Sequence, residues 1–266
     1  MRHLVYTQGV YRTPPRRIGW LARRCPSGIF YTKMMSLCAW GSIKCRLNRY
    51  DRQQWATCSH DIIKALESVG VQVEISGIEH LRALEGPVVI VANHMSMLET
   101  LFLPGIIQPI RDMGYIAKQS LLDYPFFKYL VRFGDPIGVS RTNPREDLKA
   151  VLEGGPARLR QGISMVVFIQ PTRGICFERA KVTTLGIKLA LKAKVPVMPL
   201  ALKTDAWANG SLLKDFGRID PRKTVRFCLG PPMALTGRGE AQQQAIIDFI
   251  AKTLGPWQAQ EKDLRD

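Results

Sequence analysis

The sequence predicts an α/β fold in which a mostly parallel central sheet is flanked by helices. From Val71 onward, short apolar segments alternate with segments whose apolar residues recur every three or four positions. Short apolar runs are typical of buried strands, and the wider spacing is typical of helices that lie against a sheet. Because this alternation joins strands through right-handed crossovers, we expect neighbouring strands to run parallel.

The expected strands are short runs of β-branched and other apolar residues, bounded by glycine, proline or polar positions. The run that ends at Ala92 contains no polar residue, which is typical of a strand buried on both faces. The strands cover residues 71–75, 87–92, 115–117, 137–139, 165–168, 197–202 and 225–229.

Helices are expected between these strands and on either side of them. Two helices precede the first strand, and one closes the chain. They cover residues 28–50, 55–68, 97–107, 121–133, 145–161, 185–193 and 241–254.

The positive charge of the chain is concentrated near its N-terminus. The 266 residues contain 38 Lys and Arg against 22 Asp and Glu, which gives a net charge of +16. Residues 1–52 hold eleven of the basic residues and a single acid, Asp51. This distribution favours an anionic partner, either a membrane surface or a nucleic acid. We therefore divide the chain into a basic, membrane-contacting N-terminal part of tail and helices (1–70) and an α/β domain (71–266).

The segment 28–50 combines apolar residues at helical spacing with basic residues at its end. Such an amphipathic helix can lie in the headgroup region of an anionic bilayer. The alternative is that the same apolar face packs on the protein's own core. For residues 1–27, which prolines interrupt, a solvated tail is the alternative to a membrane tether. The apolar face consists of Ile29, Phe30, Met34, Leu37, Trp40 and Ile43.

Several classes of protein are excluded by what the sequence lacks. No uncharged apolar run reaches about 18 residues, which excludes a polytopic membrane protein. Residues 1–27 lack the apolar stretch and cleavage site of a secretory signal. The six cysteines form neither a Cys-x-x-Cys pair nor a zinc pattern, as expected of reduced thiols. We therefore expect a peripheral protein on the cytosolic face of the cytoplasmic membrane.

The most informative polar residues follow the strand 87–92. Ligands of parallel sheets gather at the carboxyl ends of strands, and this strand leads into Asn93, His94, Ser96 and Glu99. Positions five apart in a regular helix diverge by about 140°. His94 and Glu99 can therefore meet only if His94 lies in the turn before the helix and Glu99 in its first turn. Glu99 would then orient His94 as a general base; the alternative is a purely structural pair.

Two further strands lead into arginine. The strand 137–139 is followed by Arg141, and the strand 165–168 is followed by Thr172 and Arg173. Guanidinium groups from separate strand ends of one sheet can converge on a phosphate, for which arginine has a matching fork of donors. A surface ion pair is the alternative for each arginine taken singly.

Taken in order, these blocks resemble the glycerophospholipid acyltransferase family, which includes 1-acyl-sn-glycerol-3-phosphate acyltransferase. The resemblance covers residues 71–232 and rests on the order of the blocks, because any one block alone is weak. The blocks are Asn93-His94-x4-Glu99, Lys118 with Leu121 and Pro125, Arg141, Phe168 to Arg173, and Val195 to Leu200.

The resemblance implies an O-acyltransferase of phospholipid biosynthesis or remodelling. It would move a fatty acyl group from acyl-CoA or acyl carrier protein to a hydroxyl of a lysophospholipid, either lysophosphatidic acid or a related acceptor. His94 would be the base, Glu99 its orienting acid, and Arg141 and Arg173 ligands of the acceptor phosphate. No metal is assigned, and no cofactor is implied beyond the acyl co-substrate. The other substrate-binding candidates are Lys118, Thr172, Asn93, Ser96 and Gln170, and the loop 207–213 is expected to line the acyl channel.

The chain departs from the family pattern in two blocks. The usual acid is Asp, where this chain has Glu99, which is one methylene longer. The block that usually reads Phe-Pro-Glu-Gly-Thr-Arg is Phe-Ile-Gln-Pro-Thr-Arg at 168–173. Gln170 therefore lacks the usual charge, and Pro171 lacks the conformational freedom of glycine and a backbone donor. We expect a changed acceptor headgroup as a result.

Two other functions are consistent with the same residues. One is a catalytically weak or inactive protein of the acyltransferase fold that binds anionic lipid or another polyanion. The other is hydrolysis at His94, with water in place of the acceptor. Nucleic acid is not expected as the polyanion, because the sequence shows no helix-turn-helix, zinc-finger or ribonucleoprotein signature.

Overall fold

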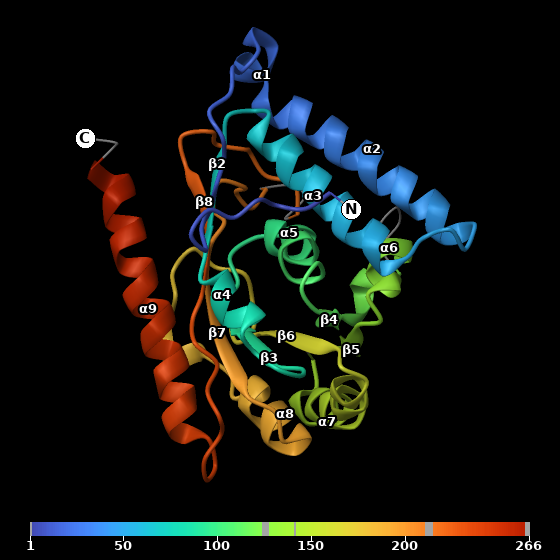
Figure 1. Ribbon diagram of the computed structural model, residues 1–266, viewed down its shortest axis with the longest axis vertical. Coiled ribbons are helices and arrows are strands. Elements are labelled where there is room, and N and C mark those ends of the chain that lie inside the picture. Colours follow the sequence, from blue (N-terminus) through green and yellow to red (C-terminus); the bar gives the residue numbers. More distant parts are fainter. Residues whose placement is uncertain (1, 124–127, 141, 211–214, 264–266) are drawn as a thin grey trace.

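The computed structural model describes residues 2–123, 128–140, 142–210 and 215–263 (Figure 1). Within these residues the strands form one eight-stranded sheet. The strands are β1 (Tyr11–Arg12), β2 (Gln72–Ser76), β3 (Val89–Ala92), β4 (Met113–Lys118), β5 (Ile137–Val139), β6 (Ser164–Phe168), β7 (Val197–Lys203) and β8 (Thr224–Leu229). Their order across the sheet is β1-β2-β8-β7-β3-β6-β4-β5.

The sheet is mostly parallel, as predicted, with antiparallel pairing in two places. β3 runs parallel to β6 and β7, and β4 runs parallel to β5 and β6. β2 is parallel to β8, whereas the pairs β1–β2 and β7–β8 are antiparallel. Every residue of β3 is buried, in agreement with its continuous apolar run. The carboxyl ends of β3 to β7 therefore lie at one edge of the sheet.

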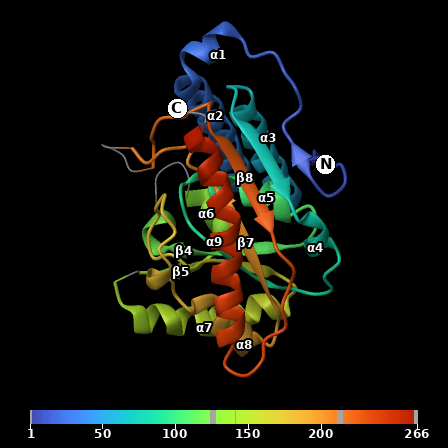
Figure 2. The same cartoon turned by 90° about the vertical axis from the view of Figure 1, so that its left-hand side faces the viewer.

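Helices cover both faces of the sheet (Figures 1 and 2). α3 and α5 lie on one face, with α2 packed on the outside of α3, and α7, α8 and α9 lie on the other. The helices are α1 (Trp20–Arg24), α2 (Pro26–Arg46), α3 (Arg52–Glu67), α4 (Ile78–Arg82), α5 (Leu98–Ile107), α6 (Lys128–Phe133), α7 (Pro144–Arg160), α8 (Leu185–Ala193) and α9 (Glu240–Asp263), with 3-10 turns η1 (Gln119–Leu121) and η2 (Arg179–Lys181).

The close packing of α5 on α3 depends on Gly105. The Ser59 hydroxyl of α3 donates to the Leu101 carbonyl (2.5 Å) and accepts from the Gly105 backbone N–H (2.7 Å). A Cβ atom at position 105 would lie 2.8 Å from the Ser59 oxygen, so glycine permits this approach. The start of α5, where Glu99 lies, is thereby fixed against the first face of the sheet.

The N-terminal residues pack on the sheet and are not simply a solvated tail. β1 adds an edge strand to β2, and Leu4 and Tyr11 are both buried in the core. Buried Glu67 accepts hydrogen bonds from the hydroxyls of Tyr11 and Thr13 and from the Lys64 ammonium. These contacts tie the N-terminal residues to α3.

α2 occupies the predicted N-terminal segment, but its expected single apolar face is not confirmed. Phe30 and Met34 are buried in the core, whereas Trp40 and Ile43 are 60% and 47% exposed. The apolar residues are thus divided between the protein's own core and its surface. In the part of the chain that is described, no helix is both long and apolar enough to cross a membrane.

α2 ends at Arg46, four residues before the expected end, and two other helices differ more from their expected bounds. α9 does not end at Leu254 but continues through Pro256 to Asp263. Trp257 packs against the core and under the Arg226 guanidinium, and this packing stabilises the turn in which Pro256 removes a backbone donor. α6 begins at Lys128 among the described residues, and residues 124–127 of the expected helix 121–133 lie outside them.

Candidate active site

The turn between β3 and α5 carries the candidate residues nearest the centre of the sheet. Asn93 follows β3 directly and is fully buried. Its side-chain amide donates to the Leu202 carbonyl (2.8 Å) and its oxygen accepts from the Leu202 N–H (2.9 Å). Asn93 therefore fastens the turn to β7, and both polar atoms of its side chain are occupied by the protein.

His94 and Glu99 meet as their spacing predicted. His94 lies in the turn and Glu99 in the first turn of α5, with 2.5 Å between His94 Nδ1 and Glu99 Oε2. His94 is 6% exposed and Glu99 is completely buried. The other carboxylate oxygen, Oε1, accepts from the backbone N–H groups of Met95 (2.8 Å) and Ser96 (2.7 Å). The turn itself therefore sets the orientation of the carboxylate.

Thr204 also holds the carboxylate, although its place in the sequence did not predict this contact. Its hydroxyl donates to Glu99 Oε1 (2.5 Å) and accepts from the Ser96 hydroxyl (3.0 Å). Thr204 is fully buried and follows the end of β7, 105 residues from Glu99. A polar residue at the end of a buried strand was the available signal, and β7 ends beside β3 in the sheet.

The neighbouring Asp205 is held between two lysines. Lys203 Nζ donates to Oδ1 (2.6 Å) and Lys223 Nζ to Oδ2 (2.5 Å). Burial raises the pKa of Asp205, but the hydrogen bonds and charges of the two lysines outweigh burial and leave this pKa below its ordinary value. The ionised cluster fixes the chain just beyond β7, from which Thr204 reaches Glu99.

The loop after β6 holds His94 from the other side. The His94 ring stacks on Phe168, with centroids 4.2 Å apart and planes 18° apart. The His94 backbone N–H donates to Gln170 Oε1 (2.8 Å), and the Gln170 amide donates to the Cys176 carbonyl (3.2 Å). Gln170 therefore supports the His94 backbone. Because Nδ1 faces Glu99, Nε2 is the ring nitrogen left for a substrate.

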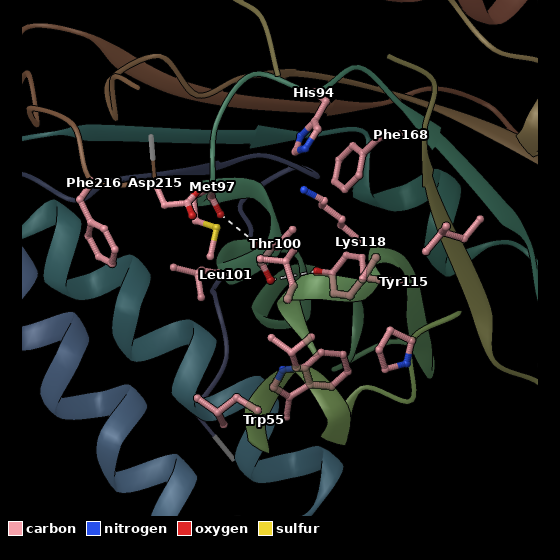
Figure 3. A pocket seen from close by; sticks show the side chains of 16 residues that line it. Trp55, His94, Met97, Thr100, Leu101, Tyr115, Lys118, Phe168, Asp215 and Phe216 are labelled. Atoms are coloured by element: carbon pink, nitrogen blue, oxygen red, sulfur yellow. Dashed lines mark hydrogen bonds between the residues drawn. The ribbon is translucent and has the colours of Figure 1, made fainter. Parts of the chain in front are cut away.

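An apolar cavity opens beside His94. Figure 3 shows His94 and Phe168 at one end of it and Trp55 at the other, with the Lys118 ammonium directed toward the His94 ring. Burial, and then the charge of Glu99, raise the pKa of Tyr115 well above its ordinary value, so this phenol stays neutral. Its hydroxyl donates to the Thr100 carbonyl (3.1 Å). We use the name apolar cavity for the space lined chiefly by Trp55, Met97, Leu101, Tyr115, Leu130, Phe168 and Phe216.

A second groove, richer in polar residues than the apolar cavity and called the polar groove below, adjoins the cavity at Ile116, Lys118 and Phe168, which line both. It lies over the loops that follow β5 and β6 and over the start of α8. Its lining includes the predicted Gln170, Thr172 and Arg173, together with Ser140, Thr142, Thr183, Thr184 and Lys188.

Of the two predicted arginines, Arg173 lies within the described residues and Arg141 does not. Arg173 Nη2 donates to Asp215 Oδ1 (2.5 Å), and both side chains are largely buried. An ion pair was the alternative for this arginine, but its partner was not predicted, because Asp215 lies 42 residues further along the chain. Arg141 and Pro125 lie outside the described residues.

In the loop 207–213, which is expected to line the acyl channel, Trp207 does not border the apolar cavity, and residues 211–213 lie outside the described residues. Trp207 is buried and packs edge-on against Phe30 and Tyr31 of α2. Its indole N–H donates to the Asp215 carbonyl (3.1 Å). Asp215 and Phe216, a few residues further on, line the apolar cavity instead.

Comparisons with known proteins agree with this geometry. Residues 72–203 match a family model described as Acyltransferase. A 1-acyl-sn-glycerol-3-phosphate acyltransferase of Pseudomonas aeruginosa is 30% identical over 192 residues, which are 72% of this chain and 70% of that protein. A probable 1-acyl-sn-glycerol-3-phosphate acyltransferase of Mycoplasma genitalium is 32% identical over 119 residues, and the match spans 44% of either chain.

A solved structure shares the fold. The crystal structure of the 1-acyl-sn-glycerophosphate (LPA) acyltransferase from Thermotoga maritima aligns with 90% of this chain and 97% of its own, with a TM-score of 0.64 and 17% sequence identity. At that identity the likeness concerns the fold, whereas the Pseudomonas relative carries the family assignment. This chain belongs to the glycerophospholipid acyltransferase family, and it is an O-acyltransferase.

Proposed function

We propose that this enzyme transfers a fatty acyl group from a thioester donor, acyl-CoA or acyl carrier protein, to the free hydroxyl of lysophosphatidic acid. The observation that carries the proposal is the buried His94–Glu99 pair at the point where the apolar cavity meets the polar groove. This position suits a reaction between a donor that carries an apolar acyl chain and an acceptor that carries a phosphate. The names of the Pseudomonas and Mycoplasma relatives support this acceptor. The changed headgroup expected from Gln170 and Pro171 is the alternative, which the lysophospholipid panel below tests.

In this proposal His94 is the general base and Glu99 holds it in the productive tautomer. Nδ1–H donates to Glu99, so the lone pair of Nε2 takes the proton of the acceptor hydroxyl as its oxygen attacks the thioester carbonyl. The new C–O bond forms, the C–S bond breaks, and His94 returns the proton to the departing sulfur. The sequence contains no Gly-x-Ser-x-Gly turn for a serine nucleophile, which agrees with direct attack by the acceptor.

The two spaces beside His94 suit the two ends of the reactants. The acyl chain of the donor would lie in the apolar cavity, where Trp55 closes the end opposite His94. The acceptor phosphate would lie in the polar groove near Lys118, Thr172 and Arg173, with Arg141 assigned to the same role. Because Arg173 is paired with Asp215, the phosphate would replace one anion with another at this guanidinium.

The basic N-terminal part, residues 1–70, would hold the enzyme peripherally on an anionic membrane at its cytosolic face. Trp20 and Leu21 of α1 are 75% and 51% exposed, and arginines lie on the same short helix. Exposed Trp40 lies beneath the Lys44 ammonium on α2. Tyr31 of α2 contacts Phe216, a wall of the apolar cavity, so the proposed membrane surface and the cavity share a helix.

An assay with purified protein and anionic vesicles tests this function. Acyl-CoA and acyl carrier protein are offered against a panel of lysophospholipids, and product and free fatty acid are both measured. We expect transfer to lysophosphatidic acid, lost in His94→Ala and retained in His80→Ala, a matched change on α4. Vesicle binding without transfer to any acceptor would overturn the proposal in favour of a binding protein, and fatty acid released without acylated product would indicate hydrolysis.

A further inference from the structure

The loop that follows β6 holds the backbone of His94 at two points. We use the name β6 loop for residues 169–176. The Gly174 N–H donates to the His94 carbonyl (3.0 Å), and the His94 N–H donates to Gln170 Oε1 (2.8 Å). Between these two contacts lie Thr172 and Arg173, which line the polar groove. The β6 loop therefore joins the turn that carries His94 directly to the side chains assigned to the acceptor phosphate.

Position 170 requires a side chain that both accepts and donates a hydrogen bond. Gln170 is 7% exposed, and its polar atoms meet opposite needs: Oε1 accepts from the His94 N–H, and Nε2 donates to the Cys176 carbonyl (3.2 Å). A neutral amide offers both functions, whereas an ionised carboxylate only accepts. The glutamate that is usual in this block would therefore direct an oxygen at the Cys176 carbonyl and remove its donor.

Pro171 restricts the backbone at the same place. Its ring fixes its own φ, and it favours extended conformations for the residue before it, Gln170. The Gln170 side chain closes the β6 loop from 170 to 176, and Pro171 reduces the number of conformations that this segment can adopt. The two departures from the family block thus act in the same direction, toward a fixed loop.

We propose that Gln170 is a positioning residue, whose neutral amide fixes the His94 turn and the β6 loop in one arrangement. The inference rests on the proposed function, which makes His94 the base and assigns the acceptor phosphate to the β6 loop. Both polar atoms of Gln170 are bonded to backbone, so it acts through its neighbours. Base and acceptor hydroxyl must approach to within about 3–3.5 Å, and a small displacement of either segment slows proton transfer.

Gln170→Met tests the bridge by steady-state kinetics with acyl donor and lysophosphatidic acid. Methionine has a similar length and removes both hydrogen bonds. We expect kcat to fall about thirtyfold and the acceptor KM to rise several-fold, with the donor KM unchanged. The matched control is Gln161→Met, because Gln161 is exposed at the C-terminal end of α7 and lines neither the cavity nor the groove.

Gln170→Glu tests the need for a donor through the pH profile. The carboxylate still accepts from the His94 N–H but cannot donate to the Cys176 carbonyl, so activity relative to wild type should be low at neutral pH. Protonation restores a donor, so this ratio should rise as the pH falls. The ratio cancels the titration of the groups that both proteins share around position 170, namely His94, Lys118 and the Arg173–Asp215 pair. Gln161→Glu should show a flat ratio.

Hydrogen exchange of the full chain gives a readout that needs no turnover. In Gln170→Met, the amides of 93–97 and 170–176 should both exchange faster, with α9 unchanged as the check that the fold is intact. Wild-type kcat in Gln170→Met, or a flat pH ratio in Gln170→Glu, would overturn the proposal. A raised acceptor KM with unchanged kcat would also overturn it, in favour of direct contact between Gln170 and the acceptor. Absence of transfer in the wild type would refute the proposed function, and hydrogen exchange would still decide whether Gln170 joins the two segments.

Discussion

The apolar cavity and the polar groove meet at Phe168 and Lys118 but are built from different parts of the fold. The cavity is lined by side chains of packed elements, among them Trp55 on α3, Leu101 on α5 and Leu130 on α6. The groove is lined by loops beyond β5 and β6 and by the first residues of helices α7 and α8. The hydrophobic core therefore extends to His94 on one side, and polar side chains, among them Lys118 and Gln170, approach it on the other. A reaction that joins an apolar chain to a phosphate-bearing alcohol suits this junction.

Glu99→Gln changes the junction and is expected to produce the largest effect, about a thousandfold loss of kcat with every donor and acceptor. Three donors converge on Oε1, so the amide oxygen of Gln stays there and its NH₂ faces His94 Nδ1. Nδ1 must then accept, the proton moves to Nε2, and the base is lost. Steady-state kinetics measures the effect, with Glu79→Gln on the exposed side of α4 as control. Wild-type kcat in Glu99→Gln would contradict the role of Glu99.

Thr204→Val is expected to lower kcat about tenfold and to leave both KM values nearly unchanged. The substitution keeps the shape of the side chain but removes the hydroxyl that donates to Glu99 and accepts from Ser96. Thr204→Ser, which retains the hydroxyl, should recover most of the activity. A rise in KM with unchanged kcat would mean that Thr204 acts on substrate binding and not through Glu99.

Trp55→Leu changes the apolar cavity and is expected to shift donor preference toward longer acyl chains by about fivefold in the ratio of kcat/KM values. The indole closes the end of the cavity opposite His94, so a smaller side chain lengthens the space. Competition between donors of different length measures the shift. As a control, Trp257→Leu on α9, outside the cavity, should leave the donor preference unchanged. An unchanged preference in Trp55→Leu would mean that the acyl chain of the donor does not bind in the apolar cavity.

Asp215→Asn acts on the polar groove through Arg173 and is expected to have the smallest effect, a two- to threefold decrease in KM for the acceptor. The substitution removes the charge that competes with the acceptor phosphate for Arg173. Donor KM should stay constant, as should both constants in Asp248→Asn, whose partner Arg179 is exposed and outside the groove. An increased acceptor KM would indicate that Asp215 holds Arg173 in its binding position.

The sequence predicted those features that depend on neighbouring residues. The strand runs and helical spacings gave the α/β fold, and the five-residue step from His94 to Glu99 gave their contact. β1 was not predicted, because a strand of two residues is too short to show an alternation of apolar and polar residues. It is defined only by its pairing with β2. Thr204 and Asp215 were missed because their partners lie 105 and 42 residues away. Such contacts are set by strand order, which the sequence of one chain does not reveal.

The turn after β3 depends on three strands at once, and this has a consequence for folding. Asn93 is hydrogen-bonded to Leu202 near the end of β7, Ser96 to Thr204 just beyond β7, and His94 to Gln170 in the loop after β6. All three strands pair in parallel and are far apart in the chain, and contacts of high sequence separation form slowly. During refolding, helical signal should therefore return before enzymatic activity. Recovered turnover would then report the completed pairing of β6, β3 and β7.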